Sequence, residues 1–151
     1  MPSPAQPEPA IVLYPPVEID FDHVTEPFWT LLRQGKLSVM RCAQCSTSRM
    51  PPNLYCPNCR STEGEWPILS GRATLYSYTV VPFKPKERDN EVFVAALVCP
   101  VELPDTKLFA SIAGCGLGDL EIGMELELAP PEPGIDRILF LPAQSRTEGG
   151  N

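Results

Sequence analysis

The sequence predicts a mainly β protein in which one short helix and a small cysteine-rich module precede a five-stranded OB-type barrel. Its 151 residues include 19 prolines, and proline removes a backbone donor and clashes inside a helix, so long helices are excluded. Two Cys-x-x-Cys pairs lie close together in the first half of the chain. After Trp66, five short segments have the alternating or continuously apolar patterns that are typical of strands.

The N-terminal region is a proline-rich arm. Six prolines lie within residues 1–16 among small and polar residues, a composition typical of polyproline II or disorder. We expect residues 1–20 to form a disordered arm and residues 144–151 to form a disordered tail. The apolar run at 11–14 leaves open the alternative that the arm lies over a partner subunit.

A short helix is predicted directly after the arm. Thr25 is placed as its N-cap, Pro27 fits the first turn and Gly35 provides the stop. One apolar face is formed by Phe28, Leu31 and Leu32. The acidic residues at its start, Asp20, Asp22 and Glu26, are interpreted as favourable charges near a helix N-terminus rather than as a metal site. A helix this short must pack against another element.

The most specific signal is the two cysteine pairs, Cys42 with Cys45 and Cys56 with Cys59. A two-residue gap lets both sulfurs of a pair point to one centre, and four thiolates form a closed tetrahedral zinc site. The alternatives are disulfides, a redox Cys-x-x-Cys and rubredoxin-like iron. A reducing compartment argues against disulfides, and the lack of a βαβ context argues against the redox motif. Zinc is therefore favoured, with iron left open.

A filled four-cysteine shell has no open position for water or substrate, so we expect this metal to be structural. The two other cysteines stand apart from it. Cys99 lies in an apolar run and is interpreted as a small buried side chain. Cys115 lies between two glycines, with no basic residue within three positions to activate it as a thiolate.

Five strand segments follow the cysteines. They are 72–81, 92–101, 108–113, 124–128 and 137–141. Five strands with an insertion between the third and the fourth match a small OB-type Greek-key barrel. We place the helix and cysteine module at 21–67 and the barrel at 68–143.

The loop between the first two barrel strands carries three of the 12 basic residues of the chain, Lys84, Lys86 and Arg88. OB barrels often bind ligands with this loop. These residues are candidates to meet the phosphates of a nucleotide-containing ligand or the carboxylates of a partner. A solvated hairpin tip, in which neighbouring acidic residues cancel the charge, is the alternative.

Composition excludes several functions. The formal net charge of −7 opposes nucleic-acid binding, in which phosphate neutralisation supplies most of the affinity. Tyr76 and Tyr78 share strand parity and could stack bases, but Arg72 is their only basic neighbour. The chain has one histidine and no P-loop or dinucleotide motif. We therefore assign no catalytic residue.

No segment approaches the roughly 18 apolar residues that span a bilayer. Residues 1–16 lack the basic and apolar regions of a signal peptide. We expect a cytoplasmic protein with neither a membrane nor a nucleic acid as its partner.

Several motifs form a recognisable series. They are Phe28-Trp29 with Leu32 and Gly35, the two cysteine pairs, residues 70–79 and Ile122-Gly123-Met124. Over residues 24–142 this series resembles the acyl-CoA-associated zinc-ribbon/OB-fold family, long catalogued as a domain of unknown function. The resemblance implies a helix that leads into a rubredoxin-like zinc ribbon, followed by an OB barrel.

Members of that family are typically small, non-catalytic subunits of thiolase-superfamily enzymes, including thiolases and steroid side-chain aldolases of the sterol-carrier thiolase type. The resemblance implies that the chain binds such an enzyme in a hetero-oligomer and helps to form or shield its acyl-CoA site. We expect no catalysis by the chain alone, and we expect Lys84, Lys86 and Arg88 to lie toward CoA or the partner. A nucleic-acid-binding or general adaptor module is the alternative, because ribbons and OB barrels both occur there.

Overall fold

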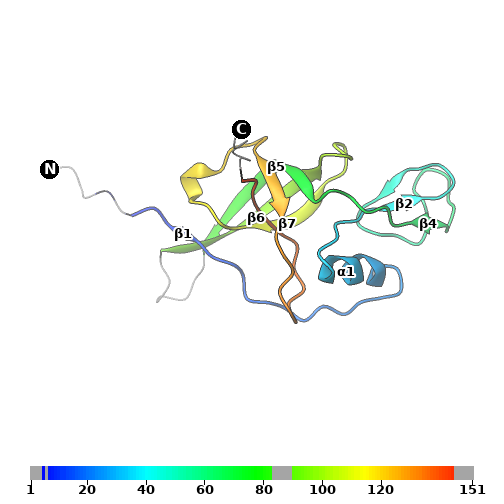
Figure 1. Cartoon of the computed structure of the whole chain (residues 1–151), viewed down its shortest axis with the longest axis horizontal. Helices are drawn as coiled ribbons and strands as arrows, with labels where there is room; N and C mark the ends of the chain where they lie inside the picture. The colour runs from blue at the N-terminus through cyan, green and yellow to red at the C-terminus, as the bar shows by residue number, and fades with distance from the viewer. Residues whose placement is uncertain (1–4, 6, 83–89, 145–151) are drawn as a thin grey trace, which may run out of the picture.

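The computed structural model describes residues 5, 7–82 and 90–144. Within these residues, a three-stranded sheet and a six-stranded sheet meet near a single α-helix (Figure 1). The elements in chain order are β1 (Ala10–Ile11), α1 (Glu26–Arg33), β2 (Met40–Cys42), β3 (Ser48–Arg49), β4 (Gly64–Glu65), β5 (Arg72–Pro82), β6 (Glu91–Pro100), β7 (Leu108–Ile112), the 3-10 turn η1 (Leu117–Asp119), β8 (Glu125–Leu128) and β9 (Leu139–Pro142). The mainly β fold class is confirmed.

Five strands of the larger sheet pair in a ring, in the order β5–β6–β7–β9–β8 and back to β5. Neighbours in the ring are antiparallel except β7 and β9, which run parallel and share the register pairs Ser111–Leu139 and Ile112–Phe140. This order places the fifth strand between the third and the fourth, which is a Greek-key arrangement. The OB-type topology expected from the five strand segments is therefore confirmed.

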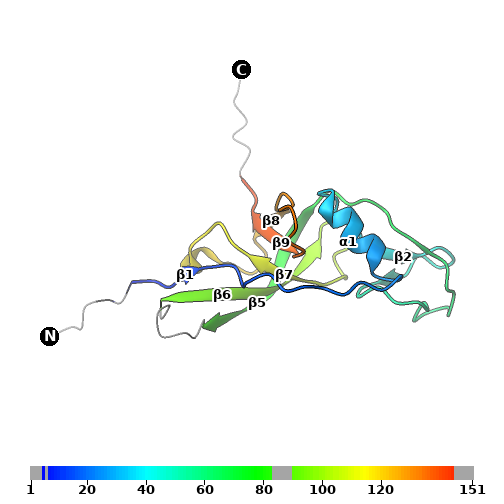
Figure 2. The same ribbon diagram turned by 90° about the horizontal axis from the view of Figure 1, so that it is seen from below.

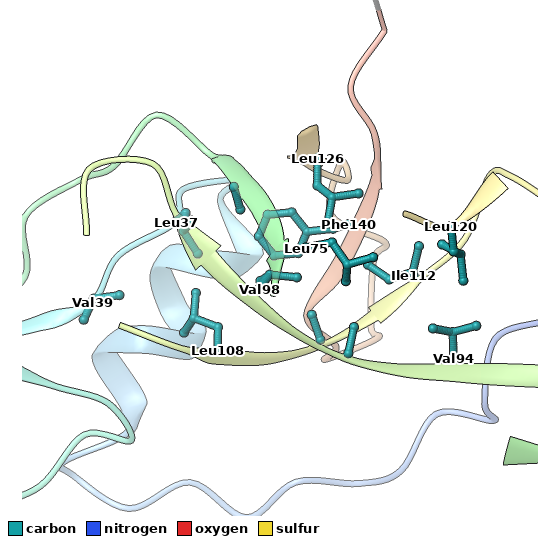
Figure 3. Close-up of a cluster of buried hydrophobic side chains, with 13 residues drawn as sticks. Leu37, Val39, Leu75, Val94, Val98, Leu108, Ile112, Leu120, Leu126 and Phe140 are labelled. Carbon is teal, nitrogen blue, oxygen red and sulfur yellow. The ribbon is translucent and has the colours of Figure 1, made fainter. Parts of the chain in front are cut away.

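Inward side chains of the ring form one hydrophobic core (Figure 3). Its buried members are Leu37, Val39, Ala73, Leu75, Val94, Ala96, Val98, Leu108, Ala110, Ile112, Leu120, Leu126 and Phe140. Leu37 and Val39 come from the segment before β2. We call this segment, together with Leu69 opposite it, the neck of the cysteine module, and the barrel core extends into it. A backbone hydrogen bond also joins the two segments of the neck, because the Leu69 N–H donates to the Leu37 carbonyl at 2.8 Å.

The cysteine module contains the smaller sheet, in the order β3–β2–β4 with antiparallel neighbours. Its strands are two or three residues long. A sheet of this size buries little apolar surface, so it needs a cross-link to hold its shape.

Helix α1 begins where expected, with Thr25 at the N-cap position, but the Thr25 side chain makes no capping hydrogen bond. The Asp22 carboxylate instead accepts the N–H groups of Val24 and Thr25, at 3.0 and 2.8 Å, and the Thr25 hydroxyl is turned toward that carboxylate. Gly35 stops the helix as predicted. It has a φ of +75°, and the Lys36 N–H returns to the carbonyl of Leu31.

Helix α1 packs through Phe28 and Leu32, which are both buried. Leu32 lines a small cavity against the segment 128–139. Arg33 forms a two-point ion pair with Asp136 in that segment, with both N–O distances at 2.7 Å. Among the described residues, no helix has the length and apolar character needed to cross a membrane.

A bulge in β5 changes the expected strand parity. The pairing with β6 shifts register between Leu75 and Ser77, so Tyr76 is the extra residue. Tyr76 is 52% exposed, whereas Tyr78 packs against the barrel core. The interpretation that these two tyrosines share one face is therefore wrong.

The proline-rich arm follows the barrel over the residues that the structure describes. Strand β1 pairs in parallel with the start of β6, and the Gly118 N–H donates to the Glu8 carboxylate. Figures 1 and 2 show the arm continuing along the barrel from β1 toward α1. This part of the arm is paired with the barrel at Ala10–Ile11, in contrast to the disorder expected for residues 1–20.

Candidate metal centre

The structure brings four sulfur atoms together at one end of the cysteine module. The Sγ atoms of Cys42, Cys45, Cys56 and Cys59 all lie within 4.8 Å of one another. Two of the separations, Cys42–Cys59 and Cys45–Cys56, are 3.5 and 3.6 Å. Tetrahedral zinc with Zn–S bonds of about 2.3 Å requires S–S separations of about 3.8 Å, so the cluster matches the size of a zinc site.

The same distances exclude disulfides within the cluster, because a disulfide joins its sulfurs at about 2.0 Å. The structure describes all six cysteines, and each of them is a free thiol. Cys99 and Cys115 do not join the cluster. Burial raises the pKa of both thiols, which agrees with their interpretation as packing residues.

Two matching turns position the four thiols. Each Cys-x-x-Cys pair is followed by a residue with positive φ, Ser46 at +62° and Arg60 at +66°. In each turn the N–H of that residue donates to the carbonyl of the first cysteine, with Ser46 bonded to Cys42 at 2.9 Å and Arg60 to Cys56 at 3.0 Å. The two pairs therefore form equivalent knuckles that face each other across the site.

Hydrogen bonds in the knuckles favour ionised sulfur at two of the four positions. Interactions with the side chains of Thr47 and Asn58 lower the pKa of Cys45 to about 5. Burial raises the pKa of Cys42, but the backbone amides of Cys45 and Gln44 outweigh it and bring this pKa to about 7. A thiol that ionises readily loses its proton to a metal at little cost.

The fourth thiol responds to the charge of its neighbours. The backbone of Ser61 lowers the pKa of Cys59, but the adjacent Cys42 thiol and burial outweigh it and raise this pKa to about 12. Like charges held this close cannot all form without a cation between them. The cluster therefore fits a divalent metal better than four free thiolates.

Arg49 is the functional residue that the sequence did not reveal. It lies in β3 with 2% of its surface exposed. Its Nη2 donates to the carbonyls of Ser61 and Glu63, at 2.9 and 3.0 Å, and its Nη1 donates to those of Asn53 and Leu54, at 3.3 and 3.4 Å.

The charge of Arg49 is matched by the thiols beside it. Burial lowers its pKa, but the neighbouring Cys42 and Cys56 raise it by more. Arg49 Nε is buried with no hydrogen-bond partner. A buried cation at this place offsets part of the negative charge of four thiolates.

The geometry supports a closed structural site rather than a catalytic one. Four sulfur ligands fill a tetrahedral shell and leave no position for substrate. A zinc ion bound by these cysteines would link the two knuckles and hold the small sheet in shape. The proposed ligand-loop residues Lys84, Lys86 and Arg88 lie outside the described residues.

Two family models match consecutive parts of the chain. Residues 29–64 match the rubredoxin-like zinc ribbon domain of ChsH2, and residues 66–129 match the C-terminal OB-fold domain of ChsH2. The boundary between the two matches, at residue 65, lies close to the neck between the small sheet and the barrel.

Two curated relatives share part of their length with the chain. A DUF35 domain-containing scaffold protein of Methanocaldococcus jannaschii is 35% identical over 91 residues, which is 58% of this chain and 62% of the relative. A probable enoyl-CoA hydratase alpha subunit of Thermomonospora curvata is 33% identical over 125 residues, which is 80% of this chain and 38% of the relative. The chain thus spans less than two thirds of the length of either relative.

Two solved structures have a similar fold. One, named Ltp2-ChsH2(DUF35) aldolase, superposes with a TM-score of 0.71 and 28% identity, over 83% of this chain and 98% of that chain. The other is a DUF35-family protein of unknown function from Sulfolobus solfataricus, with a TM-score of 0.61 and 17% identity, over 80% of this chain and 86% of that chain. The second likeness concerns the fold alone.

Proposed function

The chain belongs to the DUF35 family, with a ChsH2-type zinc ribbon followed by a ChsH2-type OB fold, and from this premise we propose that it is a non-catalytic accessory subunit of a thiolase-superfamily enzyme. Its partner is a thiolase or a steroid side-chain aldolase of the sterol-carrier thiolase type. The chain helps to form or shield the acyl-CoA site of that partner.

One observation carries this proposal. The similar chain in the Ltp2-ChsH2(DUF35) aldolase is matched over 98% of its length, so the likeness includes both the ribbon and the barrel. The scaffold name of the Methanocaldococcus relative agrees with an assisting role. A closed four-thiolate site also suits structural bracing better than catalysis.

The acyl-CoA part of the proposal rests on charge. Lys84, Lys86 and Arg88 concentrate positive charge in one loop of an otherwise acidic chain. Phosphate groups bind strongly to such side chains through charge-assisted hydrogen bonds. We assign this loop to the CoA or partner side of the complex.

A second candidate is a subunit of an enoyl-CoA hydratase. It is favoured by the name of the Thermomonospora relative, whose match covers 80% of the residues of this chain. Both candidates place an acyl-CoA on a partner chain, so the identity of that partner distinguishes them.

The test is affinity purification of the tagged full-length chain from its own organism, with mass spectrometry of the bound proteins and metal analysis of the eluate. We expect a thiolase-superfamily subunit in stoichiometric amount and one zinc per chain. The tag alone is the control. Recovery of a hydratase subunit favours the second candidate, whereas recovery of RNA without a protein partner overturns both in favour of a nucleic-acid module.

A further inference from the structure

Strand β6 is apolar on both faces. Its inward residues Val92, Val94, Ala96 and Val98 are buried in the barrel. Its outward residues between Val92 and Val98 are Phe93, Ala95 and Leu97. The outer face of a barrel strand is ordinarily polar where it meets water, so this pattern indicates that something covers it.

The neighbouring strands continue the uncharged surface. Register places Val81, Thr79 and Ser77 of β5 beside the three outward residues of β6, and it places Ser111 and Phe109 of β7 beside Ala95 and Leu97. None of these eight positions carries a charge, although 21% of the chain is charged. Phe109 is 76% exposed, the most exposed of the large apolar side chains in the described part of the chain.

We call these eight residues, with Tyr14 and Val17 of the arm, the outer face. Tyr14 joins it through an edge-on contact with Phe93, with ring centroids 5.0 Å apart. Tyr14 and Val17 also line a shallow pocket with Ser111. Both arm residues are exposed, at 49% and 60%, whereas Phe93, Ala95 and Leu97 are half-buried. The arm therefore covers part of the strand surface and adds exposed apolar area beside it.

The size of the outer face indicates a large partner. Three strands about 4.8 Å apart and five residues long cover on the order of 250 Å². A stable protein interface buries about 800 Å² on each side. The strand patch can therefore be only the centre of an interface, and the arm supplies the next part of it.

Charge argues against two occupants. The segments 83–89 and 145–151 contain one large apolar side chain, Phe83, among charged, polar and small residues, which is too little to match an apolar face of three strands. A second copy of the chain would bring together two molecules of net charge −7. On the side of the arm, the exposed residues Glu18 and Asp20 follow Val17 and would attract basic groups on a different protein. On the opposite side, Lys107 lies over the Tyr76 ring, with its Nζ 4.5 Å from the ring centroid, and would attract an acidic group.

We infer that the outer face is the docking surface for the catalytic subunit, and this inference rests on the proposed function. The partner presents a flat apolar patch to β5, β6 and β7, with lysine or arginine on the side that meets the arm. Phe109 is the most exposed anchor of the face, and exposed aromatic side chains often contribute strongly to interfaces. The arm residues Tyr14 and Val17 complete the contact.

The experiment measures binding of the purified full-length chain to the purified thiolase-superfamily subunit that it recovers. Phe109→Glu replaces the most exposed side chain of the face by a charge, and we expect at least about tenfold weaker binding. Val17→Glu places a charge on the apolar surface of the arm, and we expect it to weaken binding as well. The matched control is Ile122→Glu, because Ile122 is 64% exposed in the turn before β8, and we expect it to bind as the wild type does.

The possible outcomes distinguish failure of the docking inference from failure of the proposed function. Wild-type binding by Phe109→Glu and Val17→Glu, in chains with normal zinc content and thermal unfolding, overturns the inference and leaves the proposed function standing. Equal loss in the Ile122→Glu control overturns it as well, because the effect is then general. A wild-type dimer that Phe109→Glu splits assigns the face to a second copy instead. Failure of the wild type to recover any thiolase-superfamily subunit overturns the proposed function and the inference with it.

Discussion

Arg49 connects the chemistry of the metal site to the fold of the cysteine module. Its guanidinium donates to carbonyls on both sides of the second knuckle, so it fixes the backbone that presents Cys56 and Cys59. Its charge lies beside Cys42 and Cys56, whose interactions raise its pKa against the effect of burial. One buried side chain thus positions the ligands and offsets their charge.

We predict that Arg49→Met weakens zinc binding by about tenfold or more, since groups that orient metal ligands typically contribute this much to affinity. Competition with a chromophoric chelator measures it. The matched control is Arg41→Met in the adjacent strand, because Arg41 makes only a partly exposed ion pair with Glu65, at 2.8 Å. Equal zinc affinity of the two variants would contradict the positioning role.

The ion pair between Arg33 and Asp136 predicts a pH dependence. Its hydrogen bonds lower the pKa of Asp136 below the ordinary 3.8. A carboxyl whose pKa is lower in the folded state adds stability that is complete above its unfolded pKa and is lost as the pH falls through its folded pKa. Asp136→Asn should therefore lower the Tm at neutral pH, and this loss should disappear as the pH falls through the folded pKa of Asp136.

Thermal unfolding of the single variants Asp136→Asn and Arg33→Met and of the double variant tests this. At neutral pH we expect the double variant to lose less stability than the sum of the single losses, because the two groups interact. At low pH the losses should add. Additive losses at both pH values would show that the pair contributes nothing to stability.

The elements of the chain divide into one part that carries its own core and one part that does not. The 13 buried residues of the main cluster come from the barrel and from the loop and neck beside it. The strands β2, β3 and β4 are two or three residues long, and their sheet has the four-cysteine cluster as its cross-link. We therefore expect the barrel to be stabilised by its own core and the small sheet to depend on the cross-link between its cysteines.

We predict that removal of zinc unfolds the ribbon and spares the barrel. Addition of a strong chelator should abolish amide-exchange protection in residues 40–65, whereas β5 to β9 keep theirs, because the metal replaces the core that the small sheet lacks. Exchange measured by mass spectrometry, with and without chelator, resolves the two regions. Equal loss of protection in both would mean that the ribbon and the barrel unfold as one unit.

At the scale of the whole molecule, the strands and the cysteine cluster were predictable because they depend on local patterns. Alternation and apolar runs located the barrel strands, and cysteine spacing located the metal site. Arg49 was not predictable, because a charged residue in a short strand ordinarily lies at the surface and its four carbonyl partners come together only in the fold.

The bulge and the pairing of the arm could not be predicted, for a related physical reason. A bulge at Tyr76 changes which face the following residues occupy, and nothing in the alternating pattern marks the extra residue. The pairing of β1 depends on the free edge at the start of β6, which is a property of the assembled barrel. Thr25 occupies the N-cap position of α1, but its hydroxyl donates to the Asp22 carboxylate at 2.8 Å and caps no helix N–H.

The charge distribution of the whole molecule supports a final prediction. Reversal of Lys84, Lys86 and Arg88 to glutamate should raise the KM of the assembled complex for acyl-CoA by about tenfold or more, because charge-assisted hydrogen bonds to phosphate are lost. Complex formation should persist, since the outer face is unchanged. Steady-state kinetics and a binding assay on the same samples separate the two effects. The control, Lys36→Glu with Arg41→Glu, also makes the chain more acidic but alters the ribbon side, and it should leave KM unchanged. If the loop variant keeps both its KM and its affinity for the partner, the loop faces solvent and takes no part in acyl-CoA binding.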